Sequence, residues 1–207
     1  MPFTLQYEGG YANVTGDKGG ETYRGITRKN WSSWGGWKIV DQIKPTHNQI
    51  IPSLENLVKE FYFNNYFKNK GFDRINNLKV ATVLFDFAVH GGYSTKGLQT
   101  ILKNQFDPSI IIDGAMGAKT IDLINKVNSD QLANLIMQWR EKHLKQIISN
   151  DPSQQKFYTG WMNRLKSLSS VLNIIKNNTF LILILVGVSI LAIYLTVKRR
   201  VTDEKLE

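Results

Sequence analysis

The glycine-rich stretch of residues 8–27 contains the chemical groups needed to cleave a glycosidic bond. Glu8 stands directly before two glycines, Asp17 follows nine residues later, and Thr22 comes five residues after that. Such cleavage uses one carboxylic acid to protonate the leaving oxygen and a second carboxylate that acts on the sugar or on water. The Thr22 hydroxyl could hold that water. Carboxylates at this spacing are also common on solvated surfaces, so residue types alone leave catalysis open.

The residues before Glu8 bear on whether its carboxyl could stay protonated. Phe3, Leu5 and Tyr7 precede it, and their alternation fits either a short helix or a strand. If the segment is a helix, Glu8 lies at its C-terminus, where the partial negative charge opposes a second one. Burial against Tyr7 and Tyr11 would act in the same direction. Both effects favour the protonated form that a general acid requires.

The elements after residue 27 predict a mainly α domain. We expect a helix from Ser53, with Ser53 as its N-cap, that runs through an aromatic stretch and stops by Gly71. The nearly continuous apolar run 80–89 would fit a strand. We favour a buried central helix there, because two glycines at 91 and 92 provide a C-terminal stop. Asp86 inside this run either supports a functional group or is a buried carboxylate bonded to backbone, and we favour the structural role.

Further helices are expected towards the C-terminus. Two short ones cover 95–102 and 120–127, and a longer one begins at 129 with Ser129 as its N-cap. The last soluble helix carries an apolar stripe, and 169–178 is linker or helix. The members of that stripe are Phe157, Trp161, Leu165 and Leu168.

The segment 180–197 contains no charged residue, and Lys198-Arg199-Arg200 follows it. Eighteen such residues in a helix span about 27 Å, close to the thickness of a bilayer core. We expect a single transmembrane helix over 179–197, with the tail 198–207 on the interior side and the catalytic domain on the outer face. The N-terminus lacks the pattern of a secretory signal, which conflicts with export of that domain.

The composition excludes several other functions. The 207 residues carry 26 Lys and Arg against 17 Asp and Glu, a net charge of +9 without a run of five like charges. A diffuse positive surface suits a polyanion such as the cell wall or anionic lipid more than it suits nucleic acid. The chain has no cysteine, and its three histidines lack metal-ligand spacing. We therefore expect no metal, no cofactor and no nucleic-acid partner.

The order of residues in the 8–27 stretch resembles the N-terminal motif of the phage-type N-acetylmuramidases of glycoside hydrolase family 108. The matching positions are Glu8-Gly9-Gly10-Tyr11, Asn13, Asp17, Gly19-Gly20-Glu21-Thr22 and Gly25-Ile26-Thr27. The resemblance continues through the family's C-terminal half, a peptidoglycan-binding-like region, and covers roughly residues 5–166. Further matching positions are Phe85 to Val89, Gly91, Leu98-Gln99, Asp113-Gly114, Gly117, Lys119-Thr120 and Tyr158 to Leu165.

The resemblance implies a lysozyme-like α fold that acts on the glycan strands of peptidoglycan. The family's acid carries over to Glu8, and Asp17 and Thr22 fall where related phage lysozymes place a second carboxylate and a water-positioning threonine. The sequence departs from the family pattern at 14–16, which lacks a usual proline, and at His90, which replaces a small amide. The residues expected to contact substrate are Tyr11, Tyr23, Thr27 and Trp34. Trp31, Trp34 and Trp37 could stack on sugar rings, and for one or two of them packing in the core is at least an equal alternative.

These observations predict a lysozyme-like muramidase domain over 1–168, divided into a catalytic half 1–78 and a helical peptidoglycan-binding-like half 79–168. The linker 169–178, the transmembrane helix and the tail follow. The predicted function is a membrane-anchored, phage-encoded peptidoglycan hydrolase used in entry or lysis, placed in a virion membrane or the host inner membrane. Virion structural proteins stay open as partners. The alternatives are a non-catalytic wall-binding or structural membrane protein and a lytic transglycosylase.

Overall fold

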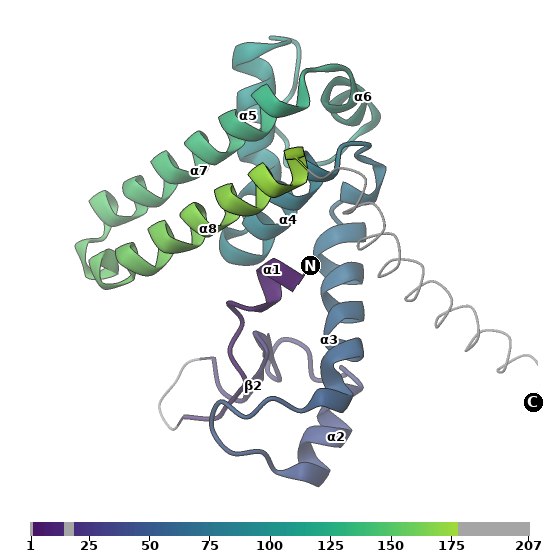
Figure 1. The fold of residues 1–207 in the computed structure, drawn as a ribbon, viewed down its shortest axis with the longest axis vertical. Helices are drawn as coiled ribbons and strands as arrows, with labels where there is room; N and C mark the ends of the chain where they lie inside the picture. The colour runs from purple at the N-terminus through teal and green to yellow at the C-terminus, as the bar shows by residue number, and fades with distance from the viewer. Residues whose placement is uncertain (1, 15–18, 178–207) are drawn as a thin grey trace, which may run out of the picture. The chain divides into compact units, whose positions relative to one another are not determined.

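The computed structural model describes residues 2–14 and 19–177 (Figure 1). The chain divides into two compact units, residues 1–152 and 153–207, each of which is described by itself. The first unit begins with α1 (Pro2–Leu5), which confirms the helical alternative for Phe3 and Leu5. The helix ends before Tyr7, so Glu8 does not lie in its last turn as the helical alternative implied. Proline at the start of a helix is favourable because its missing N–H would have no intrahelical partner there.

A small antiparallel sheet of three two-residue strands follows, in the order β1 (Tyr11–Ala12), β2 (Thr22–Tyr23) and β3 (Ile26–Thr27). Tyr23 pairs with Ile26, so only Arg24 and Gly25 connect β2 to β3. Both have positive φ, 48° and 75°. Two central residues with positive φ form the type I′ turn, whose twist matches that of the strands it joins. The glycine-rich stretch 8–27 thus contains a small hairpin sheet.

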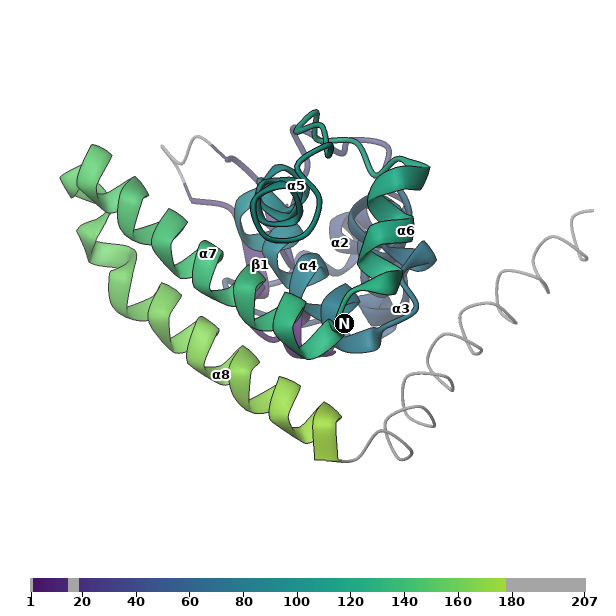
Figure 2. The same ribbon diagram turned by 90° about the horizontal axis from the view of Figure 1, so that it is seen from above.

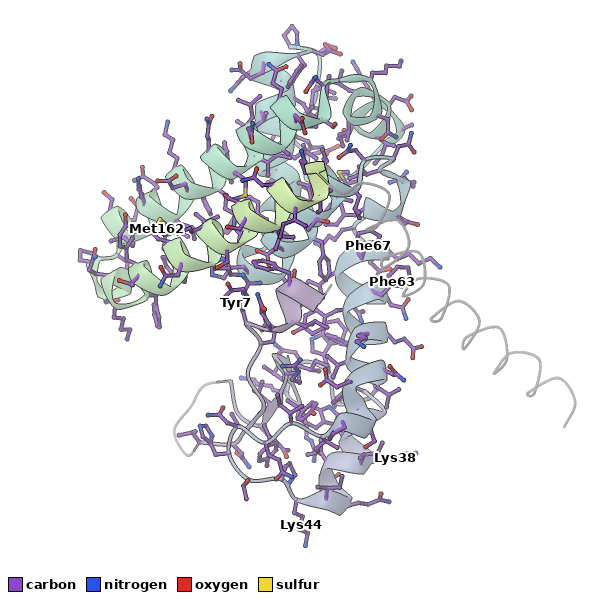
Figure 3. The ribbon with its side chains drawn as sticks, viewed as in Figure 1. Tyr7, Lys38, Lys44, Phe63, Phe67 and Met162 are labelled. Atoms are coloured by element: carbon purple, nitrogen blue, oxygen red, sulfur yellow. The ribbon has the colours of Figure 1, made fainter. Side chains whose placement is uncertain are left out.

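A long helical segment joins this sheet region to the helices above it (Figure 1). After α2 (Gly36–Ile43), a 3₁₀ turn η1 (Pro52–Leu54) leads into α3 (Glu55–Tyr62), which continues as the π-helix η2 (Phe63–Lys68). The segment ends at Gly71, as expected, with a φ of 73°. Figure 3 shows Phe63 and Phe67 on η2, where their rings stack with centroids 5.6 Å apart.

The N-cap predicted at Ser53 is wrong. Ser53 lies inside η1, and the residue before α3 is Leu54, which makes no side-chain capping bond. The physical reason is that Pro52 starts a 3₁₀ turn first, so α3 begins on an already turned backbone and the Ser53 side chain does not stand at the helix entrance.

The remaining helices of the first unit surround α4 (Leu78–Gly91), which follows the 3₁₀ turn η3 (Phe72–Arg74). Eight residues of α4 are buried, and it contacts α5 (Ser94–Gln105) and α7 (Ser129–Asn150) (Figure 2). The expected central helix is therefore confirmed over the strand alternative. Gly92 ends it with a φ of 73°, a conformation that glycine adopts without strain.

The helix α6 (Ala118–Lys126) confirms the short helix expected at 120–127, and α5 is a longer version of the one expected at 95–102. The predicted cap of α7 is wrong by one residue. The N-cap is Asn128, whose side chain accepts a hydrogen bond from the Gln131 N–H, while Ser129 is the first helical residue. Both residue types suit this position, and the backbone geometry decides between them.

In the second unit, a 3₁₀ turn η4 (Pro152–Phe157) precedes α8 (Tyr158–Asn177). Leu165 and Leu168 of the expected stripe are buried, whereas Phe157 precedes the helix and is largely exposed. The helix extends through 169–177, the segment expected to be linker or helix. Within residues 2–14 and 19–177, every helix is too short or too polar to cross a bilayer. The predicted transmembrane segment 179–197 and the tail 198–207 lie outside the described residues.

Candidate active site

The turn between α1 and β1 places the Glu8 side chain against the hairpin turn that connects β2 to β3. The Glu8 N–H bonds to the Leu5 carbonyl at 3.2 Å, so Glu8 follows the end of α1. A Cβ atom added at Gly25 would lie 2.6 Å from Glu8 Oε2 and 2.5 Å from Tyr62 Oη. Only glycine leaves room for the carboxyl group here, so the Gly25 backbone forms one wall of its pocket.

Two tyrosines of the α3–η2 segment lie on the same side as the Glu8 carboxyl. Tyr62 Oη donates a hydrogen bond to the Arg24 carbonyl at 2.8 Å. Tyr66 stands next to Tyr62, with ring centroids 5.3 Å apart. Burial raises the pKa of Tyr66, and the negative charge of Glu8 raises it further. Tyr66 therefore stays protonated at neutral pH, and it lies in a π-helical turn of the kind often found at functional sites.

Arg24 binds the main chain of Glu8 and a carboxylate of α3. Its Nη1 atom donates to the Glu8 carbonyl oxygen at 2.7 Å, and its Nη2 atom lies 3.1 Å from Glu55 Oε2. The arginine side chain is only 10% exposed. Neither Arg24, Glu55 nor the two tyrosines stood out in the sequence. The signal that could have found Arg24 is a two-residue connection ending in glycine between two short β-prone segments.

Of the other two residues predicted to act in catalysis, the structure describes Thr22 but not Asp17. Thr22 lies on β2 and is partly exposed, and its Oγ1 donates to the Gly20 carbonyl at 3.1 Å. A hydroxyl bound in this way keeps its lone pairs available to accept a hydrogen bond from water. Asp17 lies outside the described residues. The structure thus places the Glu8 carboxyl against the β2–β3 turn and Thr22 on β2, while the second carboxylate lies outside the described residues.

Tyr11, one of the four predicted substrate-contacting residues, belongs to a charged network on the sheet. Its hydroxyl donates to Glu21 Oε1 at 3.0 Å, and Glu21 pairs with Arg28 at 2.9 Å. Burial and the hydrogen bond to Glu21 raise the pKa of Tyr11. Arg28 also pairs with Asp41 at 2.6 Å. These bonds hold Tyr11 in a fixed orientation at a partly exposed position.

The remaining predicted substrate contacts differ from one another in burial. Thr27 is partly exposed, although its Oγ1 is buried and makes no hydrogen bond to the described residues. Trp34 is also partly exposed and stacks on Tyr23 with centroids 6.1 Å apart. The prediction for Tyr23 is wrong, because its side chain is fully buried and its hydroxyl bonds the Ile51 backbone, accepting from the N–H at 2.7 Å.

For Trp37, the alternative of packing in the core is the one that holds. Trp37 is buried, and its Nε1 donates to the Trp31 carbonyl at 2.8 Å, so it packs in the core. Trp37 lies on α2, and Figure 3 shows Lys38 of the same helix and its C-cap residue Lys44 away from Tyr7. Among the described residues, histidine, aspartate and glutamate form no group of three that could hold a metal ion.

Two family models match the chain over adjoining ranges. Residues 1–92 match the model described as Glycosyl hydrolase 108. This N-terminal part of the chain belongs to that glycosyl hydrolase family. It is a glycoside hydrolase of the N-acetylmuramidase type, as the sequence predicted. Residues 93–166 match a Predicted Peptidoglycan domain, which makes peptidoglycan its substrate and binding partner. The first match ends at Gly92, the residue that terminates α4.

Among solved structures, SagA of Brucella abortus resembles the chain at 26% identity and a TM-score of 0.60. The likeness covers 83% of this chain and 90% of SagA. No curated protein matches the chain. The family and this structural likeness support the mainly helical, lysozyme-like fold that the sequence predicted.

Proposed function

We propose that this glycoside hydrolase cleaves the glycan strands of peptidoglycan with Glu8 as its general acid. The observation that carries the proposal is the position of the Glu8 carboxyl group, which lies against Gly25 and near the Tyr62 hydroxyl. A carboxylic acid held in one orientation, beside a strand that carries a hydroxyl, is suited to protonate the oxygen that leaves the sugar.

The neighbours of Glu8 hold its carboxyl group in place. The Gly25 backbone and the Tyr62 hydroxyl lie on one side of that group. After proton transfer, the resulting carboxylate can accept a hydrogen bond from a tyrosine hydroxyl. Asp17 is proposed as the second carboxylate, and Thr22 as the residue that positions water.

A wall-clearing assay tests the role of Glu8. Full-length protein in detergent should clear a suspension of cell walls, and Glu8→Gln should slow clearing by roughly 10²–10⁴-fold. The matched control is Glu141→Gln, which removes a carboxylate on α7 that is 47% exposed and pairs with Lys145 at 2.6 Å. Clearing by Glu8→Gln at the control rate, with an unchanged circular dichroism spectrum, would contradict the assignment.

We further propose that the protein is held in a membrane through residues 179–197, with its catalytic domain on the outer face. The supporting observation is the uncharged stretch 180–197, which is followed directly by three basic residues. Such an anchor on a muramidase fits a phage protein that acts on the wall during entry or lysis, either from a virion membrane or from the host inner membrane.

Carbonate extraction of membranes or virions tests the anchor. The full-length protein should stay in the pellet. Gly187→Arg places a charge in the middle of the segment at a cost of about 2.5–3.5 kcal/mol and should release part of the protein. Recovery of the unchanged protein in the carbonate supernatant would contradict the anchor. Cleavage of a C-terminal tag by protease added from outside would reverse the proposed orientation.

A further inference from the structure

The turn between β2 and β3 contains an arginine in a backbone conformation that arginine rarely adopts. Arg24 has a φ of 48°, and it occupies the first central position of the two-residue connection. Asparagine, aspartate and glycine are preferred there, because residues with a bulky side chain are strained at positive φ. Strained residues persist where the surrounding structure holds them in place, and they cluster at functional sites.

What holds Arg24 is a set of four bonds that reach two segments of the first unit. On one side, its guanidinium donates to the Glu8 carbonyl at 2.7 Å and its backbone N–H donates to the Gly10 carbonyl at 3.2 Å. On the other side, Nη2 pairs with Glu55 at 3.1 Å and the Arg24 carbonyl accepts from Tyr62 at 2.8 Å. Arg24 therefore links the Glu8–Gly10 segment to α3.

This link fixes the main chain that carries the proposed acid. The Arg24 guanidinium donates to the Glu8 carbonyl, and the Arg24 backbone N–H donates to the Gly10 carbonyl. The backbone on the C-terminal side of Glu8 is therefore fixed to the hairpin. Gly25, the next residue of the same turn, forms the wall beside the Glu8 carboxyl. The Arg24-Gly25 turn thus both binds the main chain of Glu8 and lines the pocket of its carboxyl group.

We propose that Arg24 is a positioning residue for glycosidic cleavage, which acts by tying Glu8 to Glu55 on α3. The inference rests on the proposed role of Glu8 as general acid. Arg24 makes no proton transfer of its own. A displacement of a catalytic group by about 1 Å can cost about 10²-fold in rate, so loss of the link should lower turnover and leave substrate binding largely intact.

The test variant is Arg24→Asn, because asparagine suits this turn position and should relieve backbone strain while it removes the guanidinium. With soluble peptidoglycan glycan strands as substrate, we expect kcat to fall by about 10–100-fold and KM to change by less than about threefold. The urea midpoint of unfolding should stay close to that of the wild type. Arg24→Lys keeps a cation that can reach one of the two acceptors and should restore part of kcat.

Glu55→Gln is a second variant, which disrupts the same link less than Arg24→Asn does. It weakens the ion pair while Arg24 can still donate to the Glu8 carbonyl, so kcat should fall less than in Arg24→Asn. A kcat within about twofold of wild type in folded Arg24→Asn would overturn the proposal. So would losses of kcat in Arg24→Asn and Arg24→Lys that simply follow their losses of stability, which would show a structural role alone.

Glu8→Gln, assayed in parallel, separates this inference from the proposal on which it rests. Active wild type, inactive Glu8→Gln and fully active Arg24→Asn would reject the positioning role and retain Glu8 as the acid. Equal activity of wild type and Glu8→Gln would reject the proposed role of Glu8, and the positioning role of Arg24 with it.

Discussion

Two arginines of the first unit pair with carboxylates, but in different surroundings. Arg140 on α7 lies 2.7 Å from Asp86 on α4, and both side chains are fully buried. Arg24 lies 3.1 Å from Glu55, which is 26% exposed, and the same guanidinium binds the main chain of Glu8. The first pair joins two helices at the centre of a packed core. The second joins a turn to a helix beside the proposed acid.

This difference indicates separate tasks for the two regions. A fully buried ion pair is costly to desolvate, and removal of one partner leaves an uncompensated charge in the core. Arg140 also contacts His90 Nδ1 at 3.0 Å, so two of its partners lie on α4. We expect changes in the helical region to alter stability and changes around the β2–β3 turn to alter turnover. The following four predictions test that division.

The largest effect on stability should come from Arg140→Met, which leaves Asp86 buried without its cation. The free energy of unfolding should fall by about 3–5 kcal/mol, measured by urea denaturation. The double variant Asp86→Val/Arg140→Met removes both charges and should recover most of the loss. Molecules that stay folded should retain wild-type kcat. A kcat loss in the folded fraction that matches that of Arg24→Asn would contradict the division.

Gly25→Ala should affect both properties, because the added Cβ would meet Glu8 Oε2 and Tyr62 Oη. The matched control is Gly20→Ala, where φ is also positive, at 65°, but no atom of the described residues lies within 4 Å of the added Cβ. Both variants should lose about 1–2 kcal/mol of stability from the left-handed backbone. Only Gly25→Ala should lose more than about tenfold in wall clearing; equal clearing by both would show that the Glu8 pocket tolerates the methyl group.

A smaller change in stability should follow from Asn128→Ala at the start of α7. The Asn128 side chain accepts from the Gln131 N–H at 2.9 Å. Its loss should cost about 1 kcal/mol, measured by urea denaturation, without a change in kcat. Ser129→Ala is the control and should be nearly neutral. If the Ser129 variant proved the more destabilised of the two, the cap assignment would be wrong.

The smallest effect should be the pH dependence that His143 adds. Burial lowers the pKa of His143 below its ordinary value of 6.5, and its ring stacks on Trp139 with centroids 4.9 Å apart. His143 therefore binds a proton more readily in the unfolded chain than in the folded one. The stability that its neutral ring contributes is complete above about pH 6.5 and is lost as pH falls through the folded pKa. Unfolding measured at pH 7.5 and 5.5 should show a smaller loss in His143→Gln than in wild type.

The helices were predictable because their signals are local. The continuous apolar run before Gly91 fits a helix that is buried on several sides, and α4 is such a helix. The caps of α3 and α7 were each misplaced by one residue, because backbone geometry decides which residue stands at the helix entrance. The segment 169–177, expected to be linker or helix, is helical, since α8 continues past its apolar stripe to Asn177.

The candidate site was predictable only in part. Glu8 stood out through its own type and the glycines that follow it, whereas Arg24, Glu55 and Tyr62 meet it only after the hairpin packs against α3. Sequence spacing carries no signal for such contacts between distant segments. Tyr23 was misjudged for the same reason, because the side of the sheet that faces the core depends on how the strand is covered.

The most direct measurement of the central claim is the chemical identity of the glycan ends released from purified peptidoglycan. Mass spectrometry of the digest should show hydrolysed, reducing N-acetylmuramic acid ends with wild type and with Glu141→Gln, and none above background with Glu8→Gln. Anhydro-muramic ends would contradict hydrolysis and indicate a lytic transglycosylase. Absence of new ends with wild type would indicate a wall-binding protein, and unchanged release by Glu8→Gln would show that Glu8 is not the acid.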